Sequence, residues 1–571
     1  MNTPRPRNLV SALRPRRSFL AGAGMLGAAT ALAACTGDSP SPSSPTVQGP
    51  TATPLPDVAW DRADHANVPD GGTLRLAVRR LPENWNSHHR AGAVSELDLL
   101  RAPLGLGAEI TAQGTDPHPD YIESAQVTAE QPQTVSFRYN PAAVWDDGSP
   151  ITVADLISRW RANNGSDPQF EVASTVGWDQ IHSIEQTDDE FTGQIVFTSP
   201  FADWVTVLHP DVPASVTSTP QAFNQAHAST PTPSRGPFRV DSIDEGTGMV
   251  TMVRNENWWG RAPRLERIVV SALDSSQAPQ AFVSGHLDVL EVSTSQQLEL
   301  VRGRRDATIR RAGGTSWTHL TLNVEGPEAR LADPVVREAI ARGIDREAIA
   351  RAALQPLGAP VVLMDNLVHL PGHDGYEDSF GSLTHDPEAA ASLLEEAGWR
   401  MEGQRRVRDG EALAIVLVVP AQSPSLAQRA TLVETDLSGL GFEVEVREVP
   451  AETFFAEHLA QGAFDVTTFA WAATRFPGTS TVAIAYPLES GQNFTGMADE
   501  RIGPVLEEMA AAQELSERTR LANEFSAILA ETFTVIPLFV MPEVWAVREG
   551  VLNLGPSTVE RMDWTAVGLR R

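Results

Sequence analysis

The sequence contains one cysteine and no lysine. Cys35 is the only cysteine in 571 residues, so the chain forms no internal disulfide and no metal or redox site built from several cysteines. All 44 basic residues are arginine. A phosphate-binding P-loop requires its lysine and a Schiff-base enzyme requires an amine, so both classes are excluded. The folded part must be held by its hydrophobic core, and a chain of this length can bury a large one.

Positive charge is also scarce. Five of the 44 arginines precede Cys35 and the chain has 73 acidic residues, so residues 35–571 carry a net charge of −34. Such a surface repels phosphate backbones, and we expect no nucleic-acid partner. The sequence has no His-Glu-x-x-His, Gly-x-Ser-x-Gly or glycine-rich phosphate motif, which argues against an enzyme and against a bound cofactor. His88 and His89 lack the helical spacing of a zinc site.

The first 35 residues have the three parts of an export signal. Arg16 and Arg17 begin a charged head, Ala21–Ala34 is apolar and small, and Leu-Ala-Ala leads into Cys35. The apolar run is short of the roughly 20 residues that cross a bilayer as a helix. The head resembles a twin-arginine export signal. The end resembles a bacterial lipobox, whose cysteine is acylated and becomes the first mature residue.

We therefore predict a signal peptide over residues 1–34 and a lipid on Cys35 that holds the protein at the outer face of the cytoplasmic membrane. The alternative is a disordered arginine-rich end with a chance cysteine. Residues 36–57 are rich in Ser, Pro and Thr and bury too little apolar surface to fold, which predicts a flexible tether. We extend the predicted tether to residue 70.

Folded sequence is predicted to begin near Gly71. Alternating apolar residues predict strands at 71–78, 134–139, 193–197 and 249–254, and Thr152 is well placed to cap a helix over 153–162. A Ser/Thr/Pro-rich stretch at 213–237 is interpreted as a crossing between lobes.

Longer helices separate the strands of the second half. An apolar strand at 414–419, a helix at 425–440 and a strand at 442–447 form a βαβ unit, which implies parallel pairing. Further helices are predicted at 387–397, 453–461 and within 502–532, and strands at 464–471, 535–540 and 544–548. The fold class is therefore α/β.

Six stretches, in this order, resemble motifs of the extracytoplasmic solute-binding proteins of peptide-class ABC importers (family 5, the oligopeptide- and dipeptide-binding type, in its actinobacterial form). They are Trp145–Asp155 (Trp-Asp-Asp-Gly-Ser-Pro onward), Arg235–Phe238, Asn255–Gly260, Gly285–Val289, Asp333–Ala339 and Asp386–Trp399. The resemblance covers residues 71–571.

The resemblance implies a two-lobe periplasmic-binding-protein fold with an extra subdomain inserted in the first lobe. The lobes of such proteins close on a ligand by hinge motion. We place the first lobe at 71–312 with the inserted subdomain at about 104–232, the second lobe at 313–535, and a return to the first lobe at 536–571.

The resemblance also implies where a ligand binds. In relatives, a strand and the following loop of the second lobe pair with the backbone of an extended peptide. The matching residues here are Trp471, Ala472, Ala473, Thr474 and Arg475. Many relatives have an aspartate at the position of Thr474, which pairs with the free amine of the peptide. A hydroxyl cannot neutralise an ammonium group, so either another acid such as Glu489 substitutes or the ligand is not a standard peptide.

Other segments match ligand-lining stretches of relatives. They contain Trp85, Asn86, Ser87, Gly92 and Ala93 in the first lobe, and Ser316, Trp317, Asn493 and Phe494 in the second. The structural alternative for Trp317 and Trp471 is packing in the core of the lobe, and for the first-lobe residues, Asn493 and Phe494 it is an ordinary loop. His319 is expected beside Trp317.

The resemblance predicts a monomeric, lipid-anchored receptor that captures oligopeptides and delivers them to an ABC permease with a cytoplasmic ATPase. A receptor of the same fold for a glycan, a glycolipid precursor or a metal complex is one alternative, and His88, His89 and His319 are the candidate metal ligands. A regulator of envelope assembly that has kept the fold is another, because a fold does not determine a function.

Overall fold

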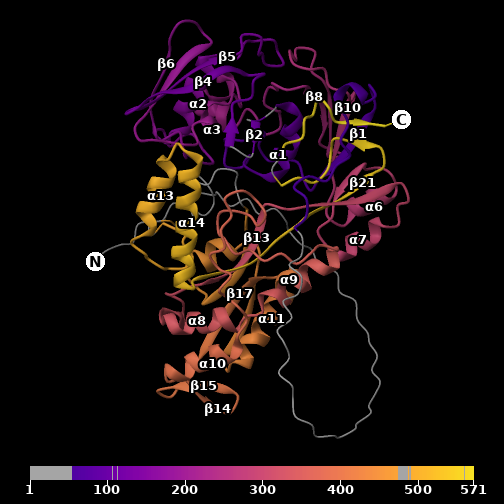
Figure 1. The fold of residues 1–571 in the computed structure, drawn as a ribbon. Coiled ribbons are helices and arrows are strands. Elements are labelled where there is room, and N and C mark those ends of the chain that lie inside the picture. The colour runs from indigo at the N-terminus through magenta and orange to yellow at the C-terminus, as the bar shows by residue number, and fades with distance from the viewer. Residues whose placement is uncertain are drawn as a thin grey trace.

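The computed structural model describes residues 54–105, 107, 109–111, 114–472, 486–487, 490, 492–558 and 560–570 (Figure 1). Cys35, Ala473, Thr474, Arg475 and Glu489 lie outside these described residues. Across the described ranges, the structure contains no helix that combines the length and the apolar character needed to cross a membrane.

A four-stranded sheet and a three-stranded sheet form the body of the first lobe. The larger has the order β1-β10-β9-β8, with β1 parallel to β10. Leu74, Leu76 and Val78 of β1 are buried on one face, which confirms the strand predicted at 71–78. The strands are β1 (Thr73–Val78), β8 (Phe238–Asp244), β9 (Met249–Arg254) and β10 (Arg267–Ala272), and, in the order β11-β21-β12, β11 (Val289–Glu291), β12 (Ala307–Ala312) and β21 (Glu543–Arg548). The associated helices are α1 (Ser95–Arg101), α6 (Gln277–Val283) and α7 (Ser295–Val301).

The inserted subdomain has its own sheet, in the order β4-β5-β7-β6, and its own apolar core. Thr152 and Asp155 form a reciprocal capping box at the start of α2, as expected for a helix with this N-cap. The elements are β2 (Glu109–Thr111), β3 (Gly114–Asp116), β4 (Ile122–Glu130), β5 (Gln133–Tyr139), β6 (Ile181–Gln186), β7 (Thr192–Phe197), α2 (Val153–Asn163), α3 (Val205–Leu208), α4 (Ala214–Thr217) and α5 (Pro220–Asn224).

The stretch at 213–237 is not a crossing between lobes. It contains α4 and α5 and leads from the inserted subdomain back into β8, which belongs to the same sheet as β1. The Ser/Thr/Pro content that suggested a linker instead supplies caps and short turns, such as the side chain of Thr219 that caps α5.

A five-stranded sheet organises the second lobe, in the order β18-β17-β19-β13-β20. Strand β17 pairs in parallel with β18 and with β19, which confirms the βαβ unit. The strands are β13 (Ser316–Leu322), β17 (Ala414–Pro420), β18 (Glu443–Val449), β19 (Val466–Ala472) and β20 (Val535–Val540). The helices are α8 (Pro334–Gly343), α9 (Arg346–Leu354), α10 (Pro387–Glu396), α11 (Pro424–Gly439), α13 (Ile502–Ala511) and α14 (Leu515–Thr532). The helix predicted at 453–461 is a π-helix, η5 (Phe454–Leu459).

The chain returns to the first lobe one strand later than predicted. Strand β20 pairs with β13 in the second-lobe sheet, and β21 is the next strand to pair with β12. The boundary at 536 is therefore corrected to follow Val540. The apolar run 535–540 is a strand buried on both faces, which suits a sheet covered by helices. We call residues 54–312 and 543–570 the first lobe, and 313–542 the second.

Two segments that lie side by side form the hinge between the lobes. Residues 313–315 connect β12 to β13, and residues 541–542 connect β20 to β21. The amide of Met541 donates to the carbonyl of Ser316 at 2.7 Å. A Cβ atom on Gly314 would overlap the carbonyl oxygen of Met541, so only glycine permits this close approach of the two backbones.

Candidate ligand-binding site

The lobes also touch at a contact formed by α13 and α14. The amide of Ala202 in the inserted subdomain donates to the carbonyl of Ala510 in α13 at 3.0 Å. The side chain of Arg518 in α14 donates to Asp203 at 3.1 Å, and these side chains are 15% and 2% exposed. Figure 1 shows the α13–α14 pair reaching the inserted subdomain. The first and second lobes are therefore joined through both the hinge and this contact.

Several predicted ligand residues of the second lobe meet in an aromatic cluster. Trp317 on β13 pairs in register with Trp471 on β19, and the ring of Phe494 stacks parallel to that of Trp471 with centroids 6.5 Å apart. We define the aromatic cluster as Trp317, His319, Phe455, Phe469, Trp471 and Phe494. Trp317, Trp471 and Phe494 are 1%, 2% and 7% exposed, so in this arrangement they pack against each other.

Polar atoms in this cluster are buried without hydrogen-bond partners. His319 is fully buried, and neither of its ring nitrogens has a partner among the described residues. Burial, with a smaller effect of Arg429, lowers the pKa of His319 to about 3. The cluster is therefore held by ring packing and excludes charge.

The segment predicted to pair with a ligand begins where β19 ends. Trp471 and Ala472 are the last residues of β19, and they pair with Trp317 and Ser316 of β13. Ser316 is half-buried. The structure thus carries the strand as far as Ala472, and the roles predicted for residues 473–475 stay predictions.

Asn493 organises its own loop. Its side-chain amide donates to the carbonyls of Met497 and Tyr486 at 3.0 and 3.3 Å, and its side-chain oxygen accepts from the hydroxyl of Thr495 at 2.6 Å. These bonds occupy both ends of the side chain. Asn493 therefore positions Phe494 within the aromatic cluster. This structural role within its loop is closer to the alternative of an ordinary loop than to ligand binding.

The predicted first-lobe loop is partly structural. Trp85 is 3% exposed and packs in the first-lobe core. Asn86 is fully buried and donates to the carbonyl of Phe223 in α5 at 3.1 Å. Gly92 is buried, and a Cβ atom there would overlap the carbonyl of Asn86. Ser87 and Ala93 are half-buried. Of the residues predicted in this loop, these two have exposed surface and no role in the core.

A partly buried charge cluster lies behind this loop, in which Arg159 and Arg235 are buried and the Asp211 side chain is 34% exposed. We define it as His88, Arg101, Arg159, Asp211 and Arg235. The carboxylate of Asp211 accepts from Arg235 at 3.0 Å and lies 3.7 Å from nitrogens of both Arg101 and His88. Ser87 accepts a hydrogen bond from Arg101.

The charge cluster fixes the ionisation of its members. Burial alone would raise the pKa of Asp211, but Arg235 and Arg101 hold that pKa well below its usual range. Burial lowers the pKa of His88 to about 4, so this histidine is neutral at pH 7. The Nε and one terminal nitrogen of Arg159 have no hydrogen-bond partner within the described chain, and its guanidinium lies over the ring of Trp178.

The three histidines considered as metal ligands do not come together. His88 faces Asp211, His89 faces Glu171 at 3.4 Å, and His319 lies in the aromatic cluster of the other lobe. In the part of the chain that the structure describes, no group of three His, Cys, Asp or Glu residues could hold a metal ion.

Sequence reasoning missed the contact between Asp203 and Arg518. These residues are 315 positions apart, and no local pattern links two positions so distant. It also missed Phe455, although the aromatic pair at 454–455 was a signal that could have pointed to the cluster.

Comparisons with known proteins agree with this architecture. The family model of bacterial extracellular solute-binding proteins, family 5 (middle), matches residues 116–493. The oligopeptide-binding protein OppA of Mycobacterium tuberculosis is 35% identical over 518 residues, which is 90% of this chain and 87% of that protein.

Two solved structures share the fold. A periplasmic EDTA-binding protein, EppA, has a TM-score of 0.81 and 25% identity, and the match covers 91% of this chain and all of that one. The oligopeptide-binding protein AppA of Bacillus subtilis, in complex with a nonapeptide, has a TM-score of 0.69 and 15% identity over 88% of this chain and all of that one. The two-lobe α/β fold, the relative matched over 90% of the chain and the family model together place this chain in family 5 of the bacterial extracellular solute-binding proteins.

Proposed function

We propose that the protein captures oligopeptides between its two lobes and delivers them to an ABC permease with a cytoplasmic ATPase. The observation that carries this proposal is the 35% identity to an oligopeptide-binding protein over 90% of the chain. The proposed binding mode is the pairing of an extended peptide with an exposed backbone edge, as in strand addition, in the segment that follows β19. In this role the protein performs no chemical reaction.

The site proposed for the peptide backbone comprises Trp471, Ala472, Ala473, Thr474 and Arg475, faced by Ser87 and Ala93. Thr474 and Arg475 carry no negative charge, so we propose that a free amino terminus is not required of the ligand. The test compares binding of a peptide with that of its N-acetylated form. Similar affinities support the proposal, and a loss of tenfold or more, about 1.4 kcal/mol, would overturn it.

We also propose that Cys35 carries a lipid and that a twin-arginine signal exports the chain. The support is the sequence pattern at 16–35. Expression of the wild type and of Cys35→Ala, followed by membrane fractionation, tests this. The wild type should sediment with membranes and the variant should be released. Replacing Arg16 and Arg17 by a pair of glutamines should block export, and continued export would contradict the twin-arginine signal.

The experiment for ligand class is native mass spectrometry of the protein that starts after Cys35, followed by denaturation and identification of the released molecules. A set of peptide masses supports the proposal. A single non-peptide mass would overturn it. A protein that stays empty in peptide mixtures would favour the envelope regulator.

A second candidate is a non-peptide ligand rich in carboxylates. The observation that favours it is the TM-score of 0.81 with the EDTA-binding protein, together with a charge cluster that contains three arginines and, among the described residues within ion-pair distance, the one carboxylate of Asp211. Titration with EDTA and with its iron complex, in parallel with peptides, separates the two candidates.

A further inference from the structure

The chain crosses the hinge a third time. Besides the segments that contain Gly314 and Met541, residues 54–61 run across it, and we call these residues the strap. The sequence pattern predicts that this segment is part of a flexible tether. In the structure it is bonded along its length.

The later part of the strap is fixed to the first lobe. The amide of Ala59 donates to the carbonyl of Pro556 at 3.0 Å, and the carbonyl of Asp61 accepts from the amide of Asn553 at 2.9 Å. The carboxylate of Asp61 pairs with the buried Arg310 of β12 at 3.0 Å. These bonds attach the strap to β12 and to the C-terminal segment.

The middle of the strap lies on the hinge itself. The carbonyl of Pro56 accepts from the amide of Gly313 at 3.0 Å, and the carbonyl of Asp57 accepts from the amide of Thr558 at 2.8 Å. The hydroxyl of Thr558 in turn donates to the carbonyl of Gly313 at 2.7 Å. Both backbone groups of this hinge glycine are therefore bonded, one by the strap and one by a residue that the strap holds.

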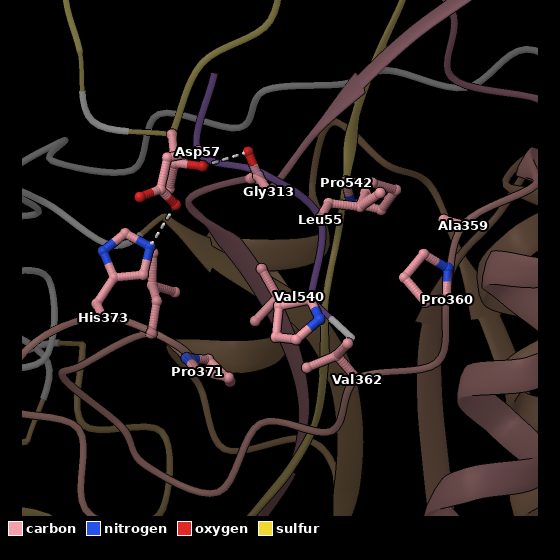
Figure 2. A pocket seen from close by; sticks show the side chains of 14 residues that line it. Leu55, Asp57, Gly313, Ala359, Pro360, Val362, Pro371, His373, Val540 and Pro542 are labelled. Atoms are coloured by element: carbon pink, nitrogen blue, oxygen red, sulfur yellow. Dashed lines mark hydrogen bonds and ion pairs between the residues drawn. The ribbon is translucent and has the colours of Figure 1, made fainter. Parts of the chain in front are cut away.

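The early part of the strap contacts the second lobe. Leu55 packs against the second-lobe core, and the carboxylate of Asp57 lies 3.3 Å from Nε2 of His373. Figure 2 shows these residues around a cavity at the hinge that Val540 and Pro542 also line. One short segment thus contacts both lobes at the point where they rotate.

The second-lobe loop that meets the strap is tied to α14. The side chain of Asn366 donates to that of Asn523 in α14 at 2.8 Å, and Asn523 donates to the carbonyl of Gly375 at 2.9 Å. The same helix carries Arg518, which pairs with Asp203 of the first lobe. The strap and the α14 contact therefore act on one connected part of the second lobe.

We infer that the strap favours the arrangement of the lobes described above, in which Arg518 contacts Asp203 and which we call closed. Its hydrogen bonds hold it to the first lobe, so rotation of the second lobe about residues 313 and 541 must separate Leu55 and Asp57 from their second-lobe partners. Contacts present in one of two arrangements shift the population toward that arrangement. The affinity for any ligand of the closed form rises with the fraction of closed molecules.

The test measures the distance between the lobes without ligand. Spin labels are placed on cysteines that replace the exposed Asp188 of the inserted subdomain and Glu508 of α13, in a chain that lacks Cys35. His373→Ala, and separately Leu55→Gly combined with Asp57→Ala, remove the second-lobe contacts of the strap. We expect the ratio of open to closed molecules to rise about three- to tenfold in both.

The control is Arg62→Ala. It breaks an exposed ion pair with Glu560 that lies next to the strap and joins first-lobe residues only, so the distance distribution should match the parent. Distributions that are the same in all variants would overturn the inference, as would an equal shift in the control. Because no ligand is added, this outcome is independent of the proposal on oligopeptides.

Discussion

The aromatic cluster of the second lobe and the charge cluster of the first lobe are held together by opposite means. The aromatic cluster packs rings against each other and leaves both ring nitrogens of His319 without partners among the described residues. The charge cluster places three arginines and His88 around Asp211. Both adjoin residues that the sequence predicted to bind a ligand.

The difference predicts how each cluster responds to change. In a packed apolar region, the cost of a substitution grows with the volume removed. In a buried charged region, the cost comes from the charge that is left without its partner. Stability should therefore depend on side-chain size and on the neutral state of His319 in the second-lobe cluster, and on the charge of Asp211 in the first-lobe cluster.

Trp471→Ala should have the largest effect. Trp471 is 2% exposed and contacts three rings of the cluster, so its truncation should lower the free energy of unfolding by about 3–5 kcal/mol. Chemical denaturation measures this. Leu515→Ala, at a position 36% exposed, should stay within about 0.5 kcal/mol of the wild type. A loss below about 1 kcal/mol for Trp471→Ala would mean that packing does not hold the cluster.

His319→Phe keeps a ring and removes the two unpartnered nitrogens. Because burial lowers the pKa of His319 to about 3, the folded protein holds it neutral while the unfolded chain binds a proton near pH 6.5. The wild type should therefore lose about 1.4 kcal/mol per pH unit at this site as the pH falls below about 6. The variant should lose less.

Urea unfolding at pH 7, 6, 5 and 4 tests this difference. The two proteins should be of similar stability at pH 7, and the variant should become the more stable one as the pH falls. Other buried histidines affect both proteins equally, so they cancel in the comparison. If the free energies of unfolding of the two proteins fall in parallel as the pH is lowered, His319 is not held neutral.

Asp211→Asn tests the charge cluster. The substitution keeps the shape and leaves Arg235 and Arg101 without their carboxylate, which should cost about 1–3 kcal/mol at pH 7. Since the pKa of Asp211 is lowered in the folded state, its contribution is complete above the unfolded pKa of about 3.9 and declines as the pH falls below that value. The difference in free energy of unfolding between the wild type and Asp211→Asn should thus be constant from pH 7 to 5 and should shrink at lower pH.

The matched control is Asp188→Asn, on an exposed turn, which should change the free energy of unfolding by less than about 0.5 kcal/mol. A gap between Asp211→Asn and the wild type that widens below pH 4 would contradict the assignment, because it would place the pKa of Asp211 above its unfolded value.

Arg518→Ala acts where the lobes meet and not inside either cluster. Because the Asp203 side chain is 2% exposed, loss of this pair should cost about 1–3 kcal/mol and raise the open fraction in the distance measurement with labels at 188 and 508. Arg520→Ala removes exposed ion pairs within α14 and should leave the distance unchanged. Equal distances in both variants would show that the Asp203 contact does not hold the lobes.

Much of the local structure could be predicted from the sequence. Apolar alternation located β1 and β9, the Asp-Pro pair at 333–334 located the start of α8, and Gly398 and Gly441 marked where α10 and α11 end. These features depend only on residues that are close together in the sequence, so the sequence alone is enough to predict them. The helix at 453–461 was predicted as helical, but its π form depends on packing that the pattern does not contain.

The candidate site was predicted less well. Trp317, Trp471 and Phe494 are predicted in three separate ligand-lining segments, and their burial against each other depends on the register of β13 and β19. Trp85 and Asn86 match a ligand-lining loop of relatives, but in this fold they attach that loop to the core and to α5.

By itself, the sequence determined the fold class, the family and the exclusion of lysine and disulfide chemistry, because these depend on composition and on motifs read in order. Tertiary structure alone decided that residues 54–61 are a strap and not a tether, that β20 stays in the second lobe, and that Asp203 meets Arg518. Each of these depends on contacts between positions far apart in the chain, and such contacts form only when the whole hydrophobic core has assembled.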